Sequence, residues 1–395
     1  MVPLTTLQGL APDAVRARAD GRPVVIWGTG DLGLDALVSL RRCGLSPRAF
    51  LHSRPGGEVA HGLPVEAVDA VLTLPAAKRP VVVIASGAFR RAAETACAAA
   101  GLVRDRDYFS HLILPRPAAV VEVAAPGGAC LPAADFGRVL TKLLADQPLL
   151  CHLELAWQGD PLAHPALPEL VAAAEARVPC TVTTALAADD ALPALLAAAP
   201  SRLNLLAPDL DGPGATAFLA RLERLRATLV PDRRTRVLLK VARRRGQAPD
   251  TLARWTRLLA DSPILLSPEM PYPSPYDPLL AACLAGGPVA GRFPELSWDL
   301  DGALAAARAD GNLPCLSQRV FPVIGADRSV GLCHLYQSPR LAPDYLAVSW
   351  AELLAHRHRA PHCASCQNHG LHRLDLPVLA RRHPTFAATL DESTP

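Results

Sequence analysis

Residues 23–33 of the chain read PVVIWGTGDLG, a short apolar run followed directly by a glycine-rich turn. The run 23–27 has the length and the β-branched content of a buried strand. A helical pattern then extends to about residue 43, so Gly28, Gly30 and Gly33 lie between a strand and a helix. Glycine at such a turn lets the backbone approach a phosphate at the N-terminus of the helix. The stretch predicts an α/β domain with a candidate nucleotide site.

The sequence that follows continues this alternation of strands and helices. Residues 48–52 and 80–85 read as further strands, and residues 89–100 read as a helix. Strands that alternate with helices indicate parallel βαβ units, here in a domain over residues 1–115. His52, Ser53 and Arg54 stand where a ribose-binding carboxylate would follow the second strand, which argues against a redox dinucleotide. A nucleotide, a nucleotide-sugar, or a tight turn without a ligand remain as alternatives.

A second series of strand-like and helix-like runs occupies residues 116–270. The expected strands are 119–123, 149–157, 180–184, 202–206, 236–241 and 264–266, and the expected helices are 132–145, 167–176, 191–199, 215–227 and 249–260. Six consecutive units predict a partial (β/α)6 barrel, with a doubly wound sheet as the alternative.

Composition limits the possible partners and the compartment. Half of the 395 residues are hydrophobic, which suits two or three globular domains. Forty basic and 37 acidic residues give a net charge of +3, so nothing favours a nucleic-acid partner or a membrane surface. Neither a targeting segment nor an apolar run of membrane-spanning length is apparent, which predicts a cytoplasmic protein. In that reducing compartment the ten cysteines are expected as thiols or metal ligands.

The third segment, residues 271–395, carries the strongest chemical signal. Cys315 and Cys333 precede a CxxC motif formed by Cys363 and Cys366, and residues 320–334 read as a hairpin that can carry Cys333 towards the motif. Four thiolates favour an iron–sulfur cluster or zinc. The wide spacing of the first pair argues against a zinc ribbon, which joins two CxxC motifs.

Two family resemblances add to this interpretation. Residues 20–110 resemble the Rossmann-like domain of bacterial sugar-modifying proteins, including PglD-type acetyltransferases. The tail resembles the SPASM/twitch region of radical-SAM proteins, with Arg328 where that pattern has a glycine. This second resemblance implies one auxiliary [4Fe–4S] cluster on the four cysteines, with zinc as the alternative.

The middle segment resembles the radical-SAM barrel. Residues 158–161, QGDP, stand where that family has its GGEP motif, which implies that Asp160 would hold the methionyl amine of S-adenosylmethionine. The family's CxxxCxxC motif is missing. The corresponding loop has only Cys130, and Ala134 and Gly137 occupy the next two cysteine positions.

These observations predict an iron–sulfur protein with a degenerate radical-SAM barrel. Its expected role is non-radical binding, electron relay, or partnership with an intact radical-SAM enzyme or another biosynthetic enzyme, in a sugar, polysaccharide or natural-product pathway. One alternative is an active iron–sulfur oxidoreductase or transferase that uses S-adenosylmethionine or a nucleotide-sugar unconventionally. Another is a zinc-stabilised sugar-nucleotide enzyme.

Overall fold

The computed structural model describes residues 10–53, 59–86, 89–156, 158–187, 191–229, 235–242, 250–269, 275–296, 299–309, 315, 320–337 and 339–374. The chain divides into two compact units. The first is Met1–Pro117 with Gln147–His152, and the second is Ala118–Asp146 with Leu153–Pro395. The division into three domains at residues 115 and 270 stays a prediction.

A six-stranded sheet forms the centre of the first unit. Its spatial order is β3-β4-β2-β1-β5-β6, and neighbouring strands pair in parallel except for β3 with β4. The strands are β1 (Val24–Trp27), β2 (Ala49–His52), β3 (Val59–Ala60), β4 (Leu63–Ala67), β5 (Val81–Ile84) and β6 (Tyr108–Ser110). The order reverses beside β1, so β1 and β5 flank the point where ligands bind in doubly wound sheets.

Helices cover both faces of this sheet. α1 (Pro12–Ala19) and α2 (Asp31–Arg42) contribute to the apolar cluster on one face, where Val24 and Ile26 point. α3 (Val68–Leu72) and α4 (Arg90–Ala99) contribute to a second cluster with Val25. The alternation of side chains along β1 explains why its continuous apolar sequence is buried on both sides.

A nine-stranded sheet forms the second unit, in the order β12-β11-β10-β9-β8-β7-β13-β14-β15. The strands are β7 (Ala118–Val121), β8 (His152–Glu154), β9 (Cys180–Thr184), β10 (Arg202–Leu206), β11 (Arg236–Ala242), β12 (Leu265–Glu269), β13 (Val320–Ile324), β14 (Val330–Gly331) and β15 (Arg340–Ala342). The molecule is therefore an α/β protein with two mostly parallel, mixed sheets.

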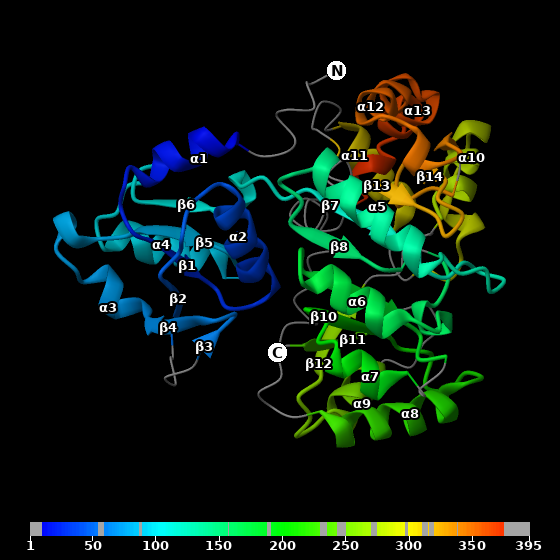
Figure 1. Cartoon of the computed structure of the whole chain (residues 1–395), viewed down its shortest axis with the longest axis horizontal. Helices are drawn as coiled ribbons and strands as arrows, with labels where there is room; N and C mark the ends of the chain where they lie inside the picture. The colour runs from blue at the N-terminus through cyan, green and yellow to red at the C-terminus, as the bar shows by residue number, and fades with distance from the viewer. Residues whose placement is uncertain are drawn as a thin grey trace. The chain divides into compact units, whose positions relative to one another are not determined.

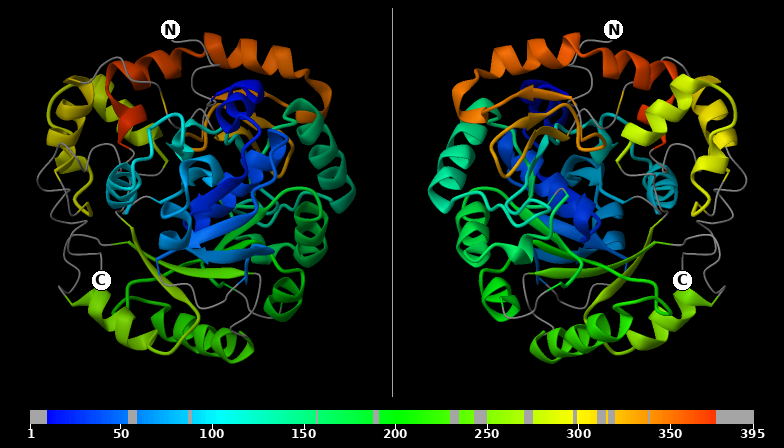
Figure 2. Two further views of the ribbon diagram at one scale, coloured as in Figure 1. Left: turned by 90° about the vertical axis from the view of Figure 1, so that its left-hand side faces the viewer. Right: turned by 90° about the vertical axis from the view of Figure 1, so that its right-hand side faces the viewer.

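The strands from β7 to β12 neighbour one another in chain order, without the reversal that a doubly wound sheet has. Five helices connect them and stand in a row along the sheet (Figure 1), on its outer side in two further views (Figure 2). They are α5 (Ala133–Asp146), α6 (Leu167–Glu175), α7 (Leu192–Ala197), α8 (Ala215–Thr228) and α9 (Thr251–Leu258). The strand expected over 149–157 is only three residues long, because a turn from Gln147 to Leu150 precedes it.

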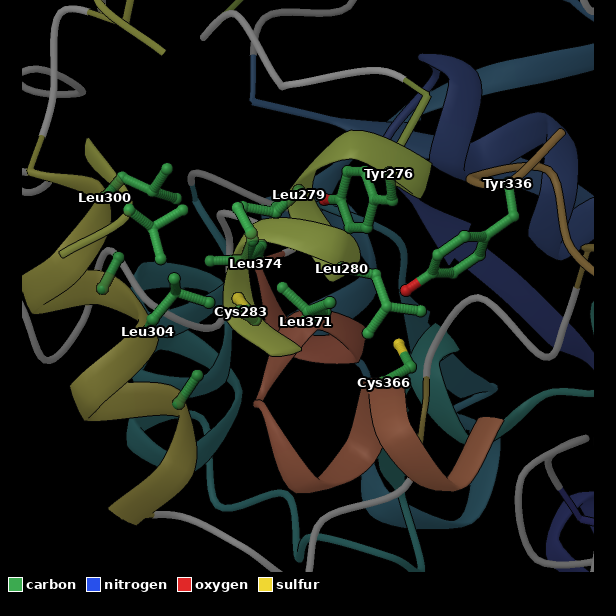
Figure 3. Close-up of a cluster of buried hydrophobic side chains, with 14 of the residues drawn as sticks. Tyr276, Leu279, Leu280, Cys283, Leu300, Leu304, Tyr336, Cys366, Leu371 and Leu374 are labelled. Atoms are coloured by element: carbon green, nitrogen blue, oxygen red, sulfur yellow. The ribbon is translucent and has the colours of Figure 1, made fainter. Parts of the chain in front are cut away.

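The remaining helices of the second unit are α10 (Asp277–Ala285), α11 (Leu300–Ala309), α12 (Trp350–Arg359) and α13 (Pro361–Asn368). Helices α10, α11 and α13 share a hydrophobic cluster with residues that follow β14 (Figure 3). The expected hairpin is formed by the antiparallel β13 and β14. In addition, β13 pairs in parallel with β7, which joins this hairpin to the main sheet. Among the described residues, no helix is long and apolar enough to span a membrane.

Candidate functional site

The four cysteines singled out in the tail line one pocket. Cys315, Cys333, Cys363 and Cys366 all contribute to its wall. The other lining residues are Leu332, Leu335, Tyr336, Arg357, His362, Gln367 and His372. Residues that are widely separated in the sequence are therefore brought to one place by the fold.

Each cysteine reaches the pocket from a defined local structure. Cys363 and Cys366 are three positions apart on α13, so they share one face of that helix. Cys363 lies in the first turn, where the helix dipole favours a thiolate. Cys333 follows β14, and the backbone N–H of Leu335 donates a hydrogen bond to it. Cys315 comes from the segment before β13 and is partly exposed.

Burial raises the pKa of three of these cysteine thiols. It raises the pKa of Cys333 to about 12, and the sulfur atoms of Cys315 and Cys363 add to the effect. The pKa values of Cys363 and Cys366 are also raised, mainly by burial. The Tyr336 hydroxyl points towards Cys366 (Figure 3), and this interaction lowers the pKa of Cys366 against the larger effect of burial. A metal centre must therefore displace protons when it binds.

The residues around the sulfur atoms fit a thiolate-bound cofactor. Arg357 is only 7% exposed, and its electrostatic neighbours include Cys333, Cys315 and Cys363. None of the described lining residues is a carboxylate, so the possible ligands are soft thiols and the imidazoles of His362 and His372. Soft sulfur ligands select zinc or iron–sulfur clusters over hard cations.

The described residues do not converge on a single ion. Among them, no three or more cysteine, histidine, aspartate or glutamate side chains lie in an arrangement that could hold one metal ion. The four cysteines nevertheless line one pocket. That they bind an iron–sulfur cluster or zinc stays a prediction.

The loop after β7 has a different structure. Ala124 and Cys130 form an antiparallel bridge, the Ala125 N–H donates to the Ala129 carbonyl, and the Leu131 N–H donates to Val123. The loop is therefore a closed, hairpin-like turn, and α5 begins soon after it at Ala133. Cys130 is partly exposed, and its thiol faces backbone carbonyls of Gly128 and Ala163.

Asp160 already has a full set of protein donors. Its carboxylate accepts hydrogen bonds from the Thr184 hydroxyl at 2.7 and 2.9 Å, and from the backbone N–H groups of Leu162, Ala185 and Ala187. It also caps the short helix η4 (Pro161–Ala163). A carboxylate has about four acceptor positions, so these contacts occupy them. In this structure Asp160 joins the loops after β8 and β9, and its role in binding S-adenosylmethionine stays a prediction.

Glu122 is a buried carboxylate that the sequence interpretation missed. It follows β7, is 5% exposed, and accepts hydrogen bonds from the backbone N–H groups of Gln158 and Gly159 at 3.0 and 3.1 Å. A Cβ atom on Gly159 would lie 2.0 Å from the Ala124 carbonyl oxygen. The loops after β7 and β8 are therefore packed closely together. The sequence could have indicated this, because Glu122 is an acidic residue within the apolar run at the end of the predicted strand.

The glycine turn of the first unit is shaped by its own backbone packing. Gly28 has a φ of +122°, and a Cβ there would lie 2.4 Å from the Ala85 carbonyl oxygen. A Cβ on Gly33 would lie 2.0 Å from the Gly28 carbonyl oxygen, and Gly30 precedes the first turn of α2. Close packing of strand and helix thus explains Gly28 and Gly33 without a ligand. A nucleotide or nucleotide-sugar here stays a prediction, and Arg54 lies outside the described residues.

Comparison with known proteins gives only distant similarity. No protein-family model and no curated protein sequence matches the chain. One solved structure, BtrN in complex with AdoMet and 2-DOIA, is 10% identical, with a TM-score of 0.35 over 64% of this chain and 91% of that one. Another, Streptococcus suis SuiB bound to S-adenosylmethionine, is 12% identical, with a TM-score of 0.39 over 65% of this chain and 70% of that one.

Proposed function

We propose that the chain binds one [4Fe–4S] cluster through Cys315, Cys333, Cys363 and Cys366. The observation that carries the proposal is that all four thiols line a single pocket together with a buried arginine. A bound cluster of this kind supplies one-electron transfer. The protein supplies four sulfur ligands, an apolar wall, and a positive charge that offsets the negative charge of the thiolates.

The arrangement favours a cluster over a single zinc ion. Zinc requires every sulfur at about 2.3 Å from one ion, which draws four sulfurs close together. A cluster places its irons and sulfides between the cysteines, so the cysteines can stand farther apart. Among the described residues, no three or more cysteine, histidine, aspartate or glutamate side chains form a group that could hold one metal ion, although four thiols line the same pocket.

We further propose that this centre works without radical cleavage of S-adenosylmethionine. On this proposal β7 to β12 are a degenerate radical-SAM-like partial barrel, and the tail is its SPASM/twitch-like region. Support comes from the closed turn after β7, where Cys130 is the single cysteine. The role that remains is to bind or relay electrons beside a separate biosynthetic enzyme, such as an intact radical-SAM enzyme.

Metal analysis of the full chain tests the cluster. After anaerobic purification we expect about four irons and four sulfides per chain, the composition of one cluster. Cys363→Ala should lose most of this iron. Cys283→Ala is the matched control, because Cys283 is a buried member of the neighbouring hydrophobic cluster and is not among the described pocket residues. An iron-free wild-type protein, or zinc in its place, would overturn the proposal.

A second assay separates the non-radical role from the cluster itself. The iron-loaded protein is reduced with dithionite and incubated with S-adenosylmethionine, and 5′-deoxyadenosine is measured. We expect no more product than in a control without protein. Product above that background would refute the non-radical role and leave the ligand set intact.

A further inference from the structure

Arg357 carries a positive charge on a side chain that is almost fully buried. It lies on α12, and its side chain is 7% exposed. Burying a cation costs several kcal/mol unless negative charge or hydrogen bonds offset the loss of water. The guanidinium stacks over the ring of Phe321, with 4.3 Å from its central carbon to the ring centroid. This contact fixes the side chain at the pocket wall.

The position of this cation relates it to the cysteines. Arg357 lines the same pocket as the four thiols, and its electrostatic neighbours include Cys333, Cys315 and Cys363. Four thiolates around a cluster would carry net negative charge, which a cation at the pocket wall attracts.

We infer that Arg357 is a positioning residue that holds a fixed positive charge beside the cluster and raises its reduction potential. This inference rests on the proposed function. Reduction adds one electron to the cluster, breaks no bond, and increases the negative charge of the site. A cation in a site of low dielectric constant stabilises the reduced form more than the oxidised form. The cluster then serves as an electron carrier rather than only as a structural cross-link.

The test is a redox titration of the purified, iron-loaded protein. Dithionite serves as the reductant, and the reduced cluster is followed by electron paramagnetic resonance. Arg357→Gln should shift the midpoint potential to more negative values, by at least a tenfold change in the reduction equilibrium constant, which is about 59 mV for one electron. Arg359→Gln is the matched control, because Arg359 lies two positions later on α12 and is exposed. The control should titrate like the wild type.

The outcomes separate this inference from the proposed function. An iron-free wild-type protein refutes the cluster, whereas iron-loaded proteins with equal potentials refute only the role of Arg357. If Arg357→Gln assembles no cluster, the Arg357→Lys variant is used to test whether the positive charge is the property that matters. That variant keeps the charge, so it should bind iron like the wild type and titrate closer to it than a neutral variant would. Loss of iron in the lysine variant as well would overturn the inference.

Discussion

The turn after β7 and the tail pocket are the two places where the sequence suggests sulfur chemistry, and the structure treats them differently. In the turn, Cys130 stands alone in a short loop that hydrogen-bonds to itself. In the pocket, three separate segments bring four cysteines together around a buried cation. A sulfur site therefore depends on which segments the fold brings together, because the local pair Cys363 and Cys366 meets Cys333 and Cys315 in the pocket, whereas Cys130 has no such neighbours among the described residues of the turn.

The largest effect on the turn is expected from Gly159→Ala. The new Cβ would lie 2.0 Å from the Ala124 carbonyl oxygen, so the loops after β7 and β8 must separate. Forcing atoms into a packed site costs roughly 1–3 kcal/mol. We expect the free energy of unfolding to fall by that amount, measured by urea denaturation of the full chain.

Gly137→Ala is the matched control for this substitution. Gly137 lies on α5, and a Cβ there meets no atom within 4 Å. Replacing a glycine inside a helix by alanine should stabilise the protein by roughly 0.5–1 kcal/mol. Equal unfolding energies for the two variants would show that the two loops are not packed as closely as described.

Sequence reasoning captured the local features of both regions. Apolar runs and turns predicted β9, β10 and β11 well, because buried strands have a clear composition. The hairpin of β13 and β14 was confirmed, and its turn includes Arg328 at a φ of +66°, the left-handed region where a glycine is favoured. The helix α12 was missed, although Ser349 and Glu352 form the capping box that marks its start.

Non-local features could not be predicted from the sequence. Nothing in residues 320–324 indicates that β13 pairs with β7, which lies far earlier in the chain, because pairing partners leave no periodic signal in one sequence. Arg357 is similar: arginines are mostly exposed, so its burial beside the thiols follows only from how α12 packs. The hydrogen bonds to Asp160 could not be predicted either, because the donors are backbone and side-chain groups spread over residues 162–187.

A smaller effect, and one that depends on pH, is expected in the hairpin turn that leads to Cys333. Burial alone raises the pKa of Asp327, but hydrogen bonds from Ser329 and the charge of Arg340 outweigh it and leave the pKa below its usual value. A carboxyl whose pKa is lowered by folding stabilises the protein above its unfolded pKa, near 4, and loses this effect as the pH falls through the folded pKa.

Asp327→Asn should therefore destabilise the chain near neutral pH and make no difference in strong acid. The Asp327 side chain is 53% exposed, so solvent screening limits the cost to about 0.5 kcal/mol. The measurement is thermal unfolding of both proteins at neutral pH and again in acid, below the folded pKa of the carboxyl. A difference that persists or grows towards acid pH would contradict this account of the turn.

The sharpest test of the comparison is a change that should have no effect on cluster content. Ala134→Cys with Gly137→Cys, added to the existing Cys130, would restore the missing cysteine spacing. Both positions are exposed on α5, so the chain should tolerate them. Because α5 would hold both introduced thiols on a rigid helix while Cys130 is held in the closed turn, the three sulfurs should not converge on a second cluster. The iron and sulfide content per chain should match that of the wild type. A doubled content would mean that the turn lacks a cluster only because two cysteines are missing, and not because of its backbone structure.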